Sequence, residues 1–250
     1  MLSVASPALL YKSTDKGKNW ELVFTDTDTA AFYNSMAFVD DQVGFAVGDP
    51  QKGCLSLIKT TDGGQTWAKI GCDILPATAD GEAGFAASNT NVIVKDNHVW
   101  LVSGGKKARV FYSGDQGGKW EVFDTPILEG SQMTGIFSGA FYDEKEGVIF
   151  GGNWEKMEHN SQNKAITRDG GKTWRLINEE GFPGYRSCVQ YIPNSEGKGM
   201  ITVGIPGTAY SADRGRTWQS VNIEPYYTIR IVDEHTAWLA GKNRIALMKF

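Results

Sequence analysis

Short apolar segments alternate with glycine-rich and polar turns along the chain, and stretches with the period of a helix are hard to find. The pattern is clear between residues 32 and 71, where four such segments follow one another: FYNSMAFVD, VGFAVGDP, CLSLIKTTD and TWAKIG. The same order recurs further on as NVIVKD, HVWLVSGG, RVFYSGD and KWEVFD. Four strands in a unit of about 50 residues are typical of one propeller blade. We therefore predict an all-β fold, a β-propeller of four-stranded blades.

A polar motif marks the turn between the third and fourth segment of a unit. Its frame is Ser/Thr-x-Asp-x-Gly-x-x-Trp, it occurs five times, and we call each copy a box. The box residues are Asp15 and Trp20, Asp62 and Trp67, Asp115 and Trp120, Asp169 and Trp174, and Asp213 and Trp218. Successive box tryptophans are 47, 53, 54 and 44 residues apart, which is typical of propellers and similar repeat arrays.

The residue types of the box indicate a turn clamp. Its Asp can accept hydrogen bonds from backbone N–H groups of the same turn, and its Gly permits a conformation that a Cβ would disfavour. Its Trp can pack between neighbouring blades and bury roughly 150 to 250 Å². One carboxylate per turn offers too few oxygens for a Ca²⁺ shell of about 6 to 8 ligands. We predict that the boxes are structural and hold no metal.

Composition and charge argue against several classes of binding partner and cofactor. The formal net charge is −4, from 25 basic and 29 acidic residues, which gives no electrostatic case for nucleic acid or an anionic membrane. No apolar stretch reaches the ~20 residues that cross a bilayer, and the N-terminal residues lack the features of a signal peptide. His98, His159 and His235 are isolated, and no glycine-rich dinucleotide loop is present. We expect no metal, no cofactor, no nucleic-acid partner and no membrane insertion.

The chain has three cysteines, Cys54, Cys72 and Cys188. Cys54 and Cys72 flank the hairpin of the second box. If that hairpin keeps a regular register, Cys54 lies opposite Asp73, so the two thiols point to opposite faces of the sheet. We therefore favour three free thiols, with a Cys54–Cys72 disulfide as the alternative.

The boxes, together with the segments FYNSMAFVDDQVGFAVGDP, GEAGFAAS, ARVFYSGD, GIFSGAF and GYRSCVQYIP, resemble the Asp-box, or bacterial neuraminidase repeat, family of β-propellers. Within it, the chain looks most like bacterial proteins related to photosystem II stability/assembly factors, and more distantly like sialidases. The resemblance implies a seven-bladed parent and a secreted or periplasmic location. It further implies that residues 1–250 are a single propeller domain of about six blades, N-terminally truncated, with an incomplete first blade. In these families the boxes lie on the face opposite the active site.

Loops on the face opposite the boxes supply the candidate ligand-binding residues. Carboxylates and guanidinium groups there suit a polar or anionic ligand, and a tryptophan outside the repeat frame could stack on a sugar or peptide. The candidates are Asp49, Glu82, Arg109, Asn153, Trp154 and Arg186. Asp49 and Glu82 are also the catalytic candidates, since a glycosidase needs two carboxyl groups about 5 to 9.5 Å apart. The alternative is that each charged residue pairs with a neighbour, and that Trp154 caps its own loop.

Serines recur near the start of the predicted first strand of four units, as Ser35, Ser88, Ser138 and Ser187. The crowded axis of a propeller needs small residues, so we predict a packing role for them.

Two functions compete. The first is a non-catalytic binding or assembly propeller, a monomer that recognises a protein or carbohydrate ligand at its central mouth in the manner of the photosystem II factors. The second is a glycoside hydrolase, sialidase-like or xyloglucanase-like, that uses the mouth carboxylates. The Phe/Tyr-Arg-Ile-Pro motif of sialidases is absent, and three of the eight arginines lie in box turns. We favour the first function and lean against an enzyme.

Overall fold

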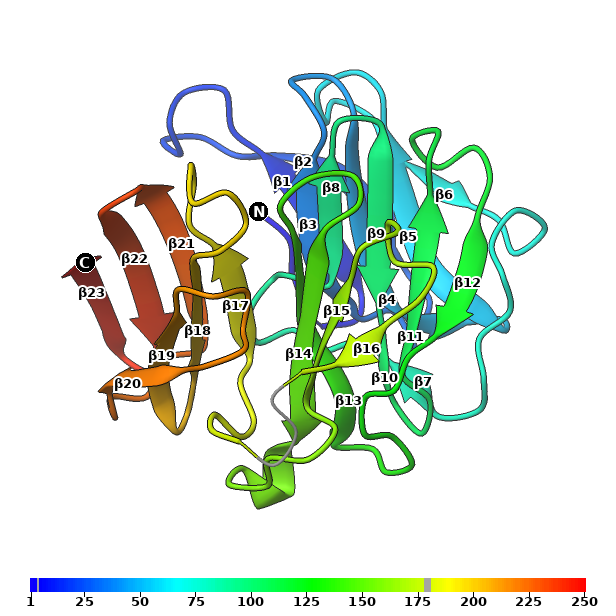
Figure 1. The fold of residues 1–250 in the computed structure, drawn as a ribbon. Coiled ribbons are helices and arrows are strands. Elements are labelled where there is room, and N and C mark those ends of the chain that lie inside the picture. The colour runs from blue at the N-terminus through cyan, green and yellow to red at the C-terminus, as the bar shows by residue number, and fades with distance from the viewer. Residues whose placement is uncertain (4, 178–180) are drawn as a thin grey trace.

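A computed structural model describes residues 1–3, 5–177 and 181–250 (Figure 1). These residues form 23 strands, arranged in six antiparallel sheets, and one short 3-10 helix, η1 (Trp154–Lys156). Several strands, such as β14 (Gly147–Asn153), are buried along almost their whole length, because their sheets pack face to face with a neighbour on each side. The prediction of an all-β fold built from four-stranded sheets is confirmed.

Three of the sheets have four strands that pair in chain order. The strands of these sheets are β3 (Tyr33–Phe38), β4 (Gly44–Gln51), β5 (Cys54–Thr60) and β6 (Ala68–Ile70); β8 (Val92–Lys95), β9 (His98–Val102), β11 (Arg109–Ser113) and β12 (Glu121–Asp124); and β17 (Cys188–Tyr191), β18 (Met200–Gly204), β19 (Gly207–Ser211) and β20 (Gln219–Asn222).

The other three sheets depart from this plan. One has four consecutive strands extended by two short ones, and the two sheets at the chain ends have two and three strands. Their strands are β13 (Thr134–Phe141), β14 (Gly147–Asn153), β15 (Lys164–Thr167) and β16 (Arg175–Leu176), with β10 (Gly104–Gly105) and β7 (Glu82–Ala83); β1 (Ala8–Lys12) and β2 (Glu21–Asp26); and β21 (Thr228–Asp233), β22 (Thr236–Gly241) and β23 (Arg244–Lys249).

Neighbouring sheets pack through five apolar clusters, one at each junction along the chain. The junction between β3–β6 and β8–β12, for example, contains Phe45, Leu57, Leu101 and Phe111, all at most 1% exposed. The first strands of successive sheets lie next to one another, as the contacts of β3 with β8, β8 with β13, β13 with β17 and β17 with β21 show (Figure 1). The sheets are therefore arranged as blades around these inner strands.

Serines near the inner strands join one sheet to the next. The Oγ of Ser35 accepts a hydrogen bond from the N–H of Val92 at 3.1 Å, and the Oγ of Ser138 accepts one from the N–H of Val189 at 3.0 Å. Ser187 donates to a backbone carbonyl just before β21. Besides being small, these serines thus form hydrogen bonds between sheets.

The loop before β8 is joined to the last sheet across the axis. The carbonyl oxygen of Ser88 accepts hydrogen bonds from the Oγ1 of Thr228 and the Nη2 of Arg230, each at 2.9 Å. The hydroxyl of Ser88 also donates to the carbonyl of Phe137 at 3.4 Å. Ser88 therefore lies at a junction of three sheets.

The fourth box shows the hydrogen bonds of a box turn. Thr167 donates from Oγ1 to Asp169 at 2.8 Å and accepts from the N–H of Gly171 at 2.9 Å. Asp169 also accepts from the N–H of Thr173, and the indole of Trp174 donates to the carbonyl of Gly171, both at 2.9 Å. The φ of Gly171 is +91°, which disfavours any residue with a Cβ. The turn is closed by the side chains of its own Thr, Asp and Trp together with its backbone.

The box tryptophans differ in burial. Trp67, Trp120, Trp174 and Trp218 each pack in the cluster between their own sheet and the preceding one. Trp218 is 9% exposed, whereas Trp20, whose sheet is the first in the described part of the chain, is 48% exposed. The same motif therefore contributes packing at four of its five positions.

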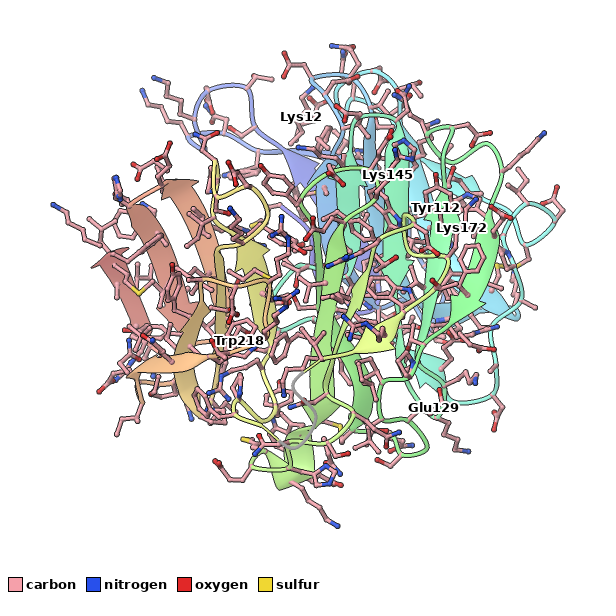
Figure 2. The ribbon with its side chains drawn as sticks, viewed as in Figure 1. Lys12, Tyr112, Glu129, Lys145, Lys172 and Trp218 are labelled. Atoms are coloured by element: carbon pink, nitrogen blue, oxygen red, sulfur yellow. A yellow bond between two sulfur atoms is a disulfide. The ribbon has the colours of Figure 1, made fainter. Side chains whose placement is uncertain are left out.

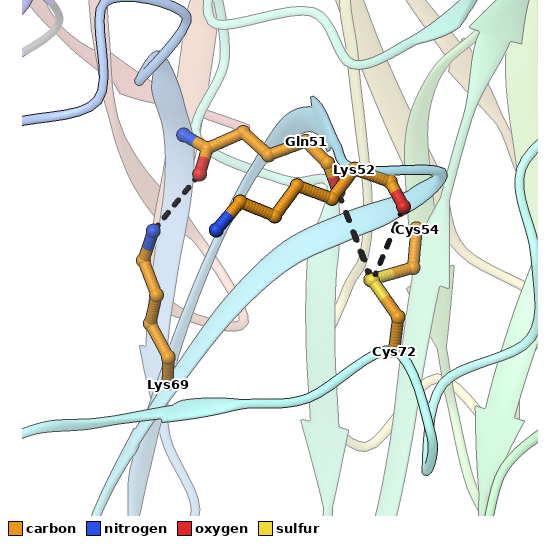
Figure 3. Close-up of a disulfide and its surroundings, with 5 residues drawn as sticks. All are labelled: Gln51, Lys52, Cys54, Lys69 and Cys72. Atoms are coloured by element: carbon orange, nitrogen blue, oxygen red, sulfur yellow. Dashed lines mark hydrogen bonds between the residues drawn. A yellow bond between two sulfur atoms is a disulfide. The ribbon is translucent and has the colours of Figure 1, made fainter.

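Cys54 and Cys72 form a disulfide, so the favoured prediction of three free thiols is wrong (Figure 3). The regular register ends at Ile70, the last residue of β6, and the N–H of Ile74 then bonds to the carbonyl of Gly71. This turn takes Cys72 out of the ladder and brings its Cα within 5.5 Å of the Cα of Cys54. A strand register cannot predict the direction of a side chain beyond the end of the strand.

Candidate functional site

The box turns and the candidate residues lie on opposite faces of the molecule. A box turn bonds to the turn between the first two strands of its own sheet, as the N–H of Gly170 does to the carbonyl of Lys145 at 3.0 Å. In Figure 2, Lys145 and Lys172 of these turns lie in the upper half, and Glu129, from a loop of the other face, lies in the lower half. The helix η1 and the strands β7 and β10 also lie in the lower part of Figure 1. The candidate residues belong to this lower face.

Glu82 and Arg109 form a buried ion pair. The Glu82 side chain is fully buried, and its Oε2 lies 2.5 Å from the Nη2 of Arg109. Its Oε1 accepts hydrogen bonds from the Nε of Arg109 at 3.1 Å and the Oγ of Ser103 at 2.5 Å, and its Oε2 accepts a further one from the N–H of Ala79 at 2.8 Å. Each carboxylate oxygen thus accepts two hydrogen bonds from the protein. This geometry favours the pairing alternative over a free catalytic carboxylate.

Asp49 attaches β4 to the loop that carries Glu82. Its Oδ1 accepts hydrogen bonds from the N–H of Gly84 at 2.9 Å and from the Nδ2 of Asn34 at 3.3 Å. Burial raises the pKa of Asp49, against the effect of these two bonds. A Cβ at residue 84 would lie 2.1 Å from the Nδ2 of Asn34, so any other residue there would displace the Asn34 side chain that bonds to Asp49. Asp49, Glu82 and Arg109 are therefore brought together as anchors of one loop.

Asn153 and Trp154 form a second group. Asn153 ends β14 and caps η1, because its Oδ1 accepts hydrogen bonds from the N–H groups of Glu155 at 2.8 Å and Lys156 at 3.2 Å. The backbone of Trp154 is held by the carbonyl of Met133 at 3.0 Å, while its side chain is 40% exposed. The cap therefore presents an indole ring to solvent.

Arg186 lies inside the protein beside this loop. The two are joined because the N–H of Tyr185 bonds to the carbonyl of Met157 at 2.8 Å. Arg186 is 1% exposed, its Nη1 donates to the carbonyl of Tyr185 at 2.7 Å, and its guanidinium lies 5.4 Å from the ring centre of Phe182. Its Nε has no hydrogen-bond partner in the described chain. Burial lowers the pKa of Arg186 to about 10.

Lys164 is a second buried cation in the same place, and it is not among the predicted candidates. Its side chain is fully buried, and its Nζ donates to the Oδ1 of Asn163 at 2.9 Å and to the carbonyls of Gly181 at 2.8 Å and Pro183 at 3.2 Å. Burial and, next, the charge of Arg186 lower the pKa of Lys164 to about 8. Two cations thus lie close together in one buried region.

A repeat comparison could have found Lys164. The residue three positions before the Ser or Thr of the box is apolar or small in the other units and buried in all of them: Leu10, Leu57, Val110 and Thr208. A lysine at this core position departs from the repeat, and such a departure is a signal of local function.

Aromatic rings join the two groups of candidates. The ring of Phe85, in the loop after β7, stacks on Phe137 of β13 with centres 3.6 Å apart. Phe137 then meets Tyr185 edge-on at 4.8 Å. The six candidate residues therefore fall into two groups around this row of three aromatic rings. Among the candidates, Trp154 has the exposed side chain.

The centre of the ring of strands is hollow on the box side. A cavity of about 390 Å³ there is lined by residues of five first strands, among them Met36, Val94, Gln190 and Arg230. The Nη2 of Arg230 donates to the carbonyl of Ser88 at 2.9 Å. Arg230, which the sequence analysis did not single out, thus has its charge engaged by the loop before β8.

Two further findings concern the described residues alone. In residues 1–3, 5–177 and 181–250, no group of three or more His, Cys, Asp or Glu side chains is placed to hold a metal ion. Within the same residues, no helix is long and apolar enough to cross a membrane.

Two curated proteins are similar in sequence, while no protein-family model matches the chain. The photosystem II stability/assembly factor HCF136 of Arabidopsis thaliana is 27% identical over 181 residues, which cover 66% of this chain and 40% of that protein. The oligoxyloglucan-reducing end-specific xyloglucanase of Emericella nidulans is 29% identical over 125 residues, 46% of this chain and 14% of that protein. The chain thus spans less than half of either relative. The predicted resemblance to photosystem II assembly factors with glycosidase relatives is confirmed.

Solved structures of low sequence identity have the same fold. The GH74 enzyme of Niastella koreensis matches with a TM-score of 0.68 and 14% identity over 96% of this chain and 38% of that one. YCF48 bound to D1 peptide matches with a TM-score of 0.51 and 16% identity over 99% of this chain and 88% of that one. The WD40 beta propeller domain of Doa1 matches with a TM-score of 0.54 and 14% identity over 87% of this chain and 64% of that one. These likenesses confirm the β-propeller fold.

Proposed function

We propose that the chain is a non-catalytic binding or assembly propeller that recognises a segment of another protein at the mouth of the central channel, on the face opposite the boxes. One observation carries the proposal. Lys164 and Arg186 are buried cations without a carboxylate at ion-pair distance in residues 1–3, 5–177 and 181–250, and the residue before Arg186 bonds to the loop that follows the exposed Trp154. Glu158 raises the pKa of Arg186 only from beyond that distance.

The chemistry of this place favours a partner segment with an anionic group. Two positive charges in a region of low dielectric attract an anion more strongly than charges in water do, even though the whole chain carries −4. Trp154 adds a ring on which an apolar or planar group can stack. A carboxylate next to an apolar side chain, as in an acidic peptide, meets both requirements.

Relatives and one covalent feature support the wider proposal. One relative is a stability/assembly factor, and one structure of the same fold holds a peptide. The Cys54–Cys72 disulfide supports a secreted or periplasmic location, since disulfides persist in oxidising compartments. We also propose that the chain acts as a monomer and as one propeller domain, and a carbohydrate ligand is the alternative at the same mouth.

Peptide binding tests this function. A fluorescein-labelled acidic peptide with interspersed aromatic residues, and a matched peptide with Gln and Asn in place of Glu and Asp, would be titrated by fluorescence anisotropy. We expect the acidic peptide to bind, and Trp154→Ala and Lys164→Met to weaken its binding. Trp238→Ala is the matched control, because Trp238 is 50% exposed on the last sheet. Equal binding of both peptides, or equal losses in Trp154→Ala and Trp238→Ala, would contradict the proposal.

The glycoside hydrolase remains the second function, because the xyloglucanase is a sequence relative. Asp49 and Glu82 are still its catalytic candidates, although their hydrogen bonds within the protein disfavour a role as free acid or nucleophile. The test is hydrolysis of xyloglucan oligosaccharides and of sialyl substrates. Turnover that is abolished by Asp49→Asn or Glu82→Gln, in folded variants, would overturn the non-catalytic proposal.

A further inference from the structure

The cavity on the box side of the central channel has the size and lining of a small-molecule site. Its volume is about 390 Å³, and its walls belong to the first strands of five sheets, β3, β8, β13, β17 and β21. Volumes of this order are typical of sites that enclose a small ligand. Most of the lining side chains are apolar, among them Met36, Ile93, Val94, Phe141 and Ile231.

Residues 88–90 form the inner end of this cavity. The Oδ1 of Asn89 accepts a hydrogen bond from the N–H of Met36 in β3 at 2.7 Å, and the carbonyl of Thr90 accepts one from the N–H of Gly139 in β13 at 3.3 Å. Asn89 and Thr90 both line the cavity. The segment is therefore fixed to the sheets on either side of its own, and the cavity has a firm base.

Arg230 is the single charged side chain among the described residues that line the cavity. Its Nη1 donates to the Oγ1 of Thr228 and the carbonyl of Ile229, both at 2.8 Å. Its Nη2 donates to the carbonyls of Ser88 at 2.9 Å and Asn89 at 3.1 Å. These oxygen atoms are neutral, and no described carboxylate lies at ion-pair distance from Arg230. The guanidinium is thus held in place while its positive charge stays uncompensated.

The free polar groups beside this charge are hydrogen-bond donors. The Oε1 of Gln190 accepts from the N–H of Ile231 at 2.9 Å, and its Nε2 has no partner in the described chain. The Nε of Arg230 has none there either, and neither nitrogen is among the buried polar atoms that lack a partner. Both nitrogens are therefore accessible to a ligand. Two accessible donors next to a positive charge suit an anion that accepts hydrogen bonds.

We propose that this cavity binds a small organic carboxylate with an apolar body. The carboxylate accepts hydrogen bonds from Arg230 and Gln190, and the apolar body lies against the walls of the five first strands. The partly enclosed position strengthens the attraction of the guanidinium for the anion relative to water. The site lies on the box side, so it is separate from Lys164 and Arg186 and independent of the function proposed for the opposite face.

The probe is para-fluorobenzoate, and para-fluorobenzamide is its neutral counterpart of nearly the same shape. Titrations followed by fluorine NMR should give a dissociation constant of about 1 mM or lower for the benzoate and at least about tenfold weaker binding for the benzamide. Acetate has the carboxylate without the ring, so it should compete only at concentrations about tenfold higher or more. The absence of saturable binding, or equal affinity for the benzoate and the benzamide, would overturn the proposal.

A charge-removing variant tests the role of the guanidinium. Arg230→Gln should weaken binding of the benzoate at least about tenfold. Lys95→Gln is the matched control, because Lys95 is the exposed last residue of β8 and does not line the cavity. It should leave the affinity unchanged, with circular dichroism confirming that both variants fold. Full binding of the benzoate by folded Arg230→Gln would overturn the proposal.

Amide chemical shifts of the unmodified protein locate the probe without any variant. The side-chain amide of Gln190 and the backbone amides of Met36 and Ile231 should shift as the benzoate saturates the site, and the indole N–H of Trp154 should not. Shifts at Trp154 with none around Gln190 would contradict the assignment, because the benzoate would then occupy the opposite face.

Discussion

The two faces of the propeller are held by interactions of different range. On the box face, each turn is closed by hydrogen bonds between residues no more than four positions apart, such as Asp169 and Thr173. On the opposite face, the loop of Glu82 is held by Arg109, 27 residues away, and by Asp49, which bonds to a residue 35 positions away. A face stabilised by a repeated local motif can keep the fold while the other face varies. This difference places the repeated local motif on one face and the candidate binding residues on the other.

The largest effect is expected from removing a packed box tryptophan. Trp218→Ala should lower the free energy of unfolding by about 3 to 5 kcal/mol, because the ring is 9% exposed and packs between two sheets. Trp20→Ala, at the same box position but 48% exposed, should cost less than about 1 kcal/mol. Urea unfolding followed by circular dichroism measures both values. Similar losses in the two variants would show that the box itself, and not its burial, carries the stability.

A comparable loss on the opposite face should follow from breaking its buried ion pair. Arg109→Met should cost about 3 kcal/mol, since the fully buried Glu82 carboxylate would lose its counter-charge. The double variant Glu82→Leu with Arg109→Met should recover most of this loss, because no buried charge remains. The same urea experiment tests it. If the double variant is less stable than Arg109→Met alone, the two side chains stabilise the fold by more than the compensation of their charges.

Reduction of the Cys54–Cys72 disulfide, which lies on the same face, should lower the free energy of unfolding by a smaller amount. Cys54 and Cys72 are 18 positions apart, and closing a loop of that size stabilises a protein by about 2 to 3 kcal/mol. The Cys54→Ser, Cys72→Ser variant should therefore unfold at lower urea concentration, and a reducing agent should destabilise the unmodified protein but not the variant. Equal sensitivity of both to the reducing agent would contradict this assignment.

The smallest loss of stability per residue is expected at low pH, and it arises from the carboxylates of the boxes. A backbone hydrogen bond from Asn19, followed by side-chain bonds from Asn19 and Ser13, lowers the pKa of Asp15 from 3.8 to about 2. The Thr66 side chain likewise lowers the pKa of Asp62. A carboxyl group with a lowered pKa stabilises the fold above pH 3.8, and this stabilisation is lost as the pH falls towards 2.

The melting temperature should therefore fall steeply between pH 4 and pH 2, as differential scanning calorimetry would show. Asp62→Asn should flatten this profile, and Asp41→Asn, outside the boxes, is its control. Parallel profiles for the unmodified protein and Asp62→Asn would mean that the box carboxylates do not carry the acid dependence.

Much of the fold was predictable because its information is local. The strand pattern and the box appear within about ten residues each, and both recur, so errors in one unit are corrected by the others. The disulfide was mispredicted because the chain turns directly after Ile70, and the register of β6 does not extend to Cys72. Lys164 was missed because an isolated lysine in a short strand carries no motif, and only its position in the repeat distinguishes it.

The candidate site was predictable in its residue types but not in its contacts. The sequence placed Asp49, Glu82, Arg109 and Arg186 in loops of one face, and it left open which of them have partners. That depends on loops that meet across sheets, such as the one that brings Glu82 to Arg109. The number of blades in the natural parent and the role of each candidate residue stay predictions.

The sequence by itself determined that this protein is a propeller of repeated four-stranded sheets, because hydrophobic alternation and turn chemistry act over a few residues. Only the tertiary structure decided which charges are compensated and which tryptophans are buried. Those properties arise from contacts between sheets, in which residues far apart in the chain share one desolvated space. Trp20 and Trp218 have the same motif, and only their neighbours make one exposed and the other part of the core.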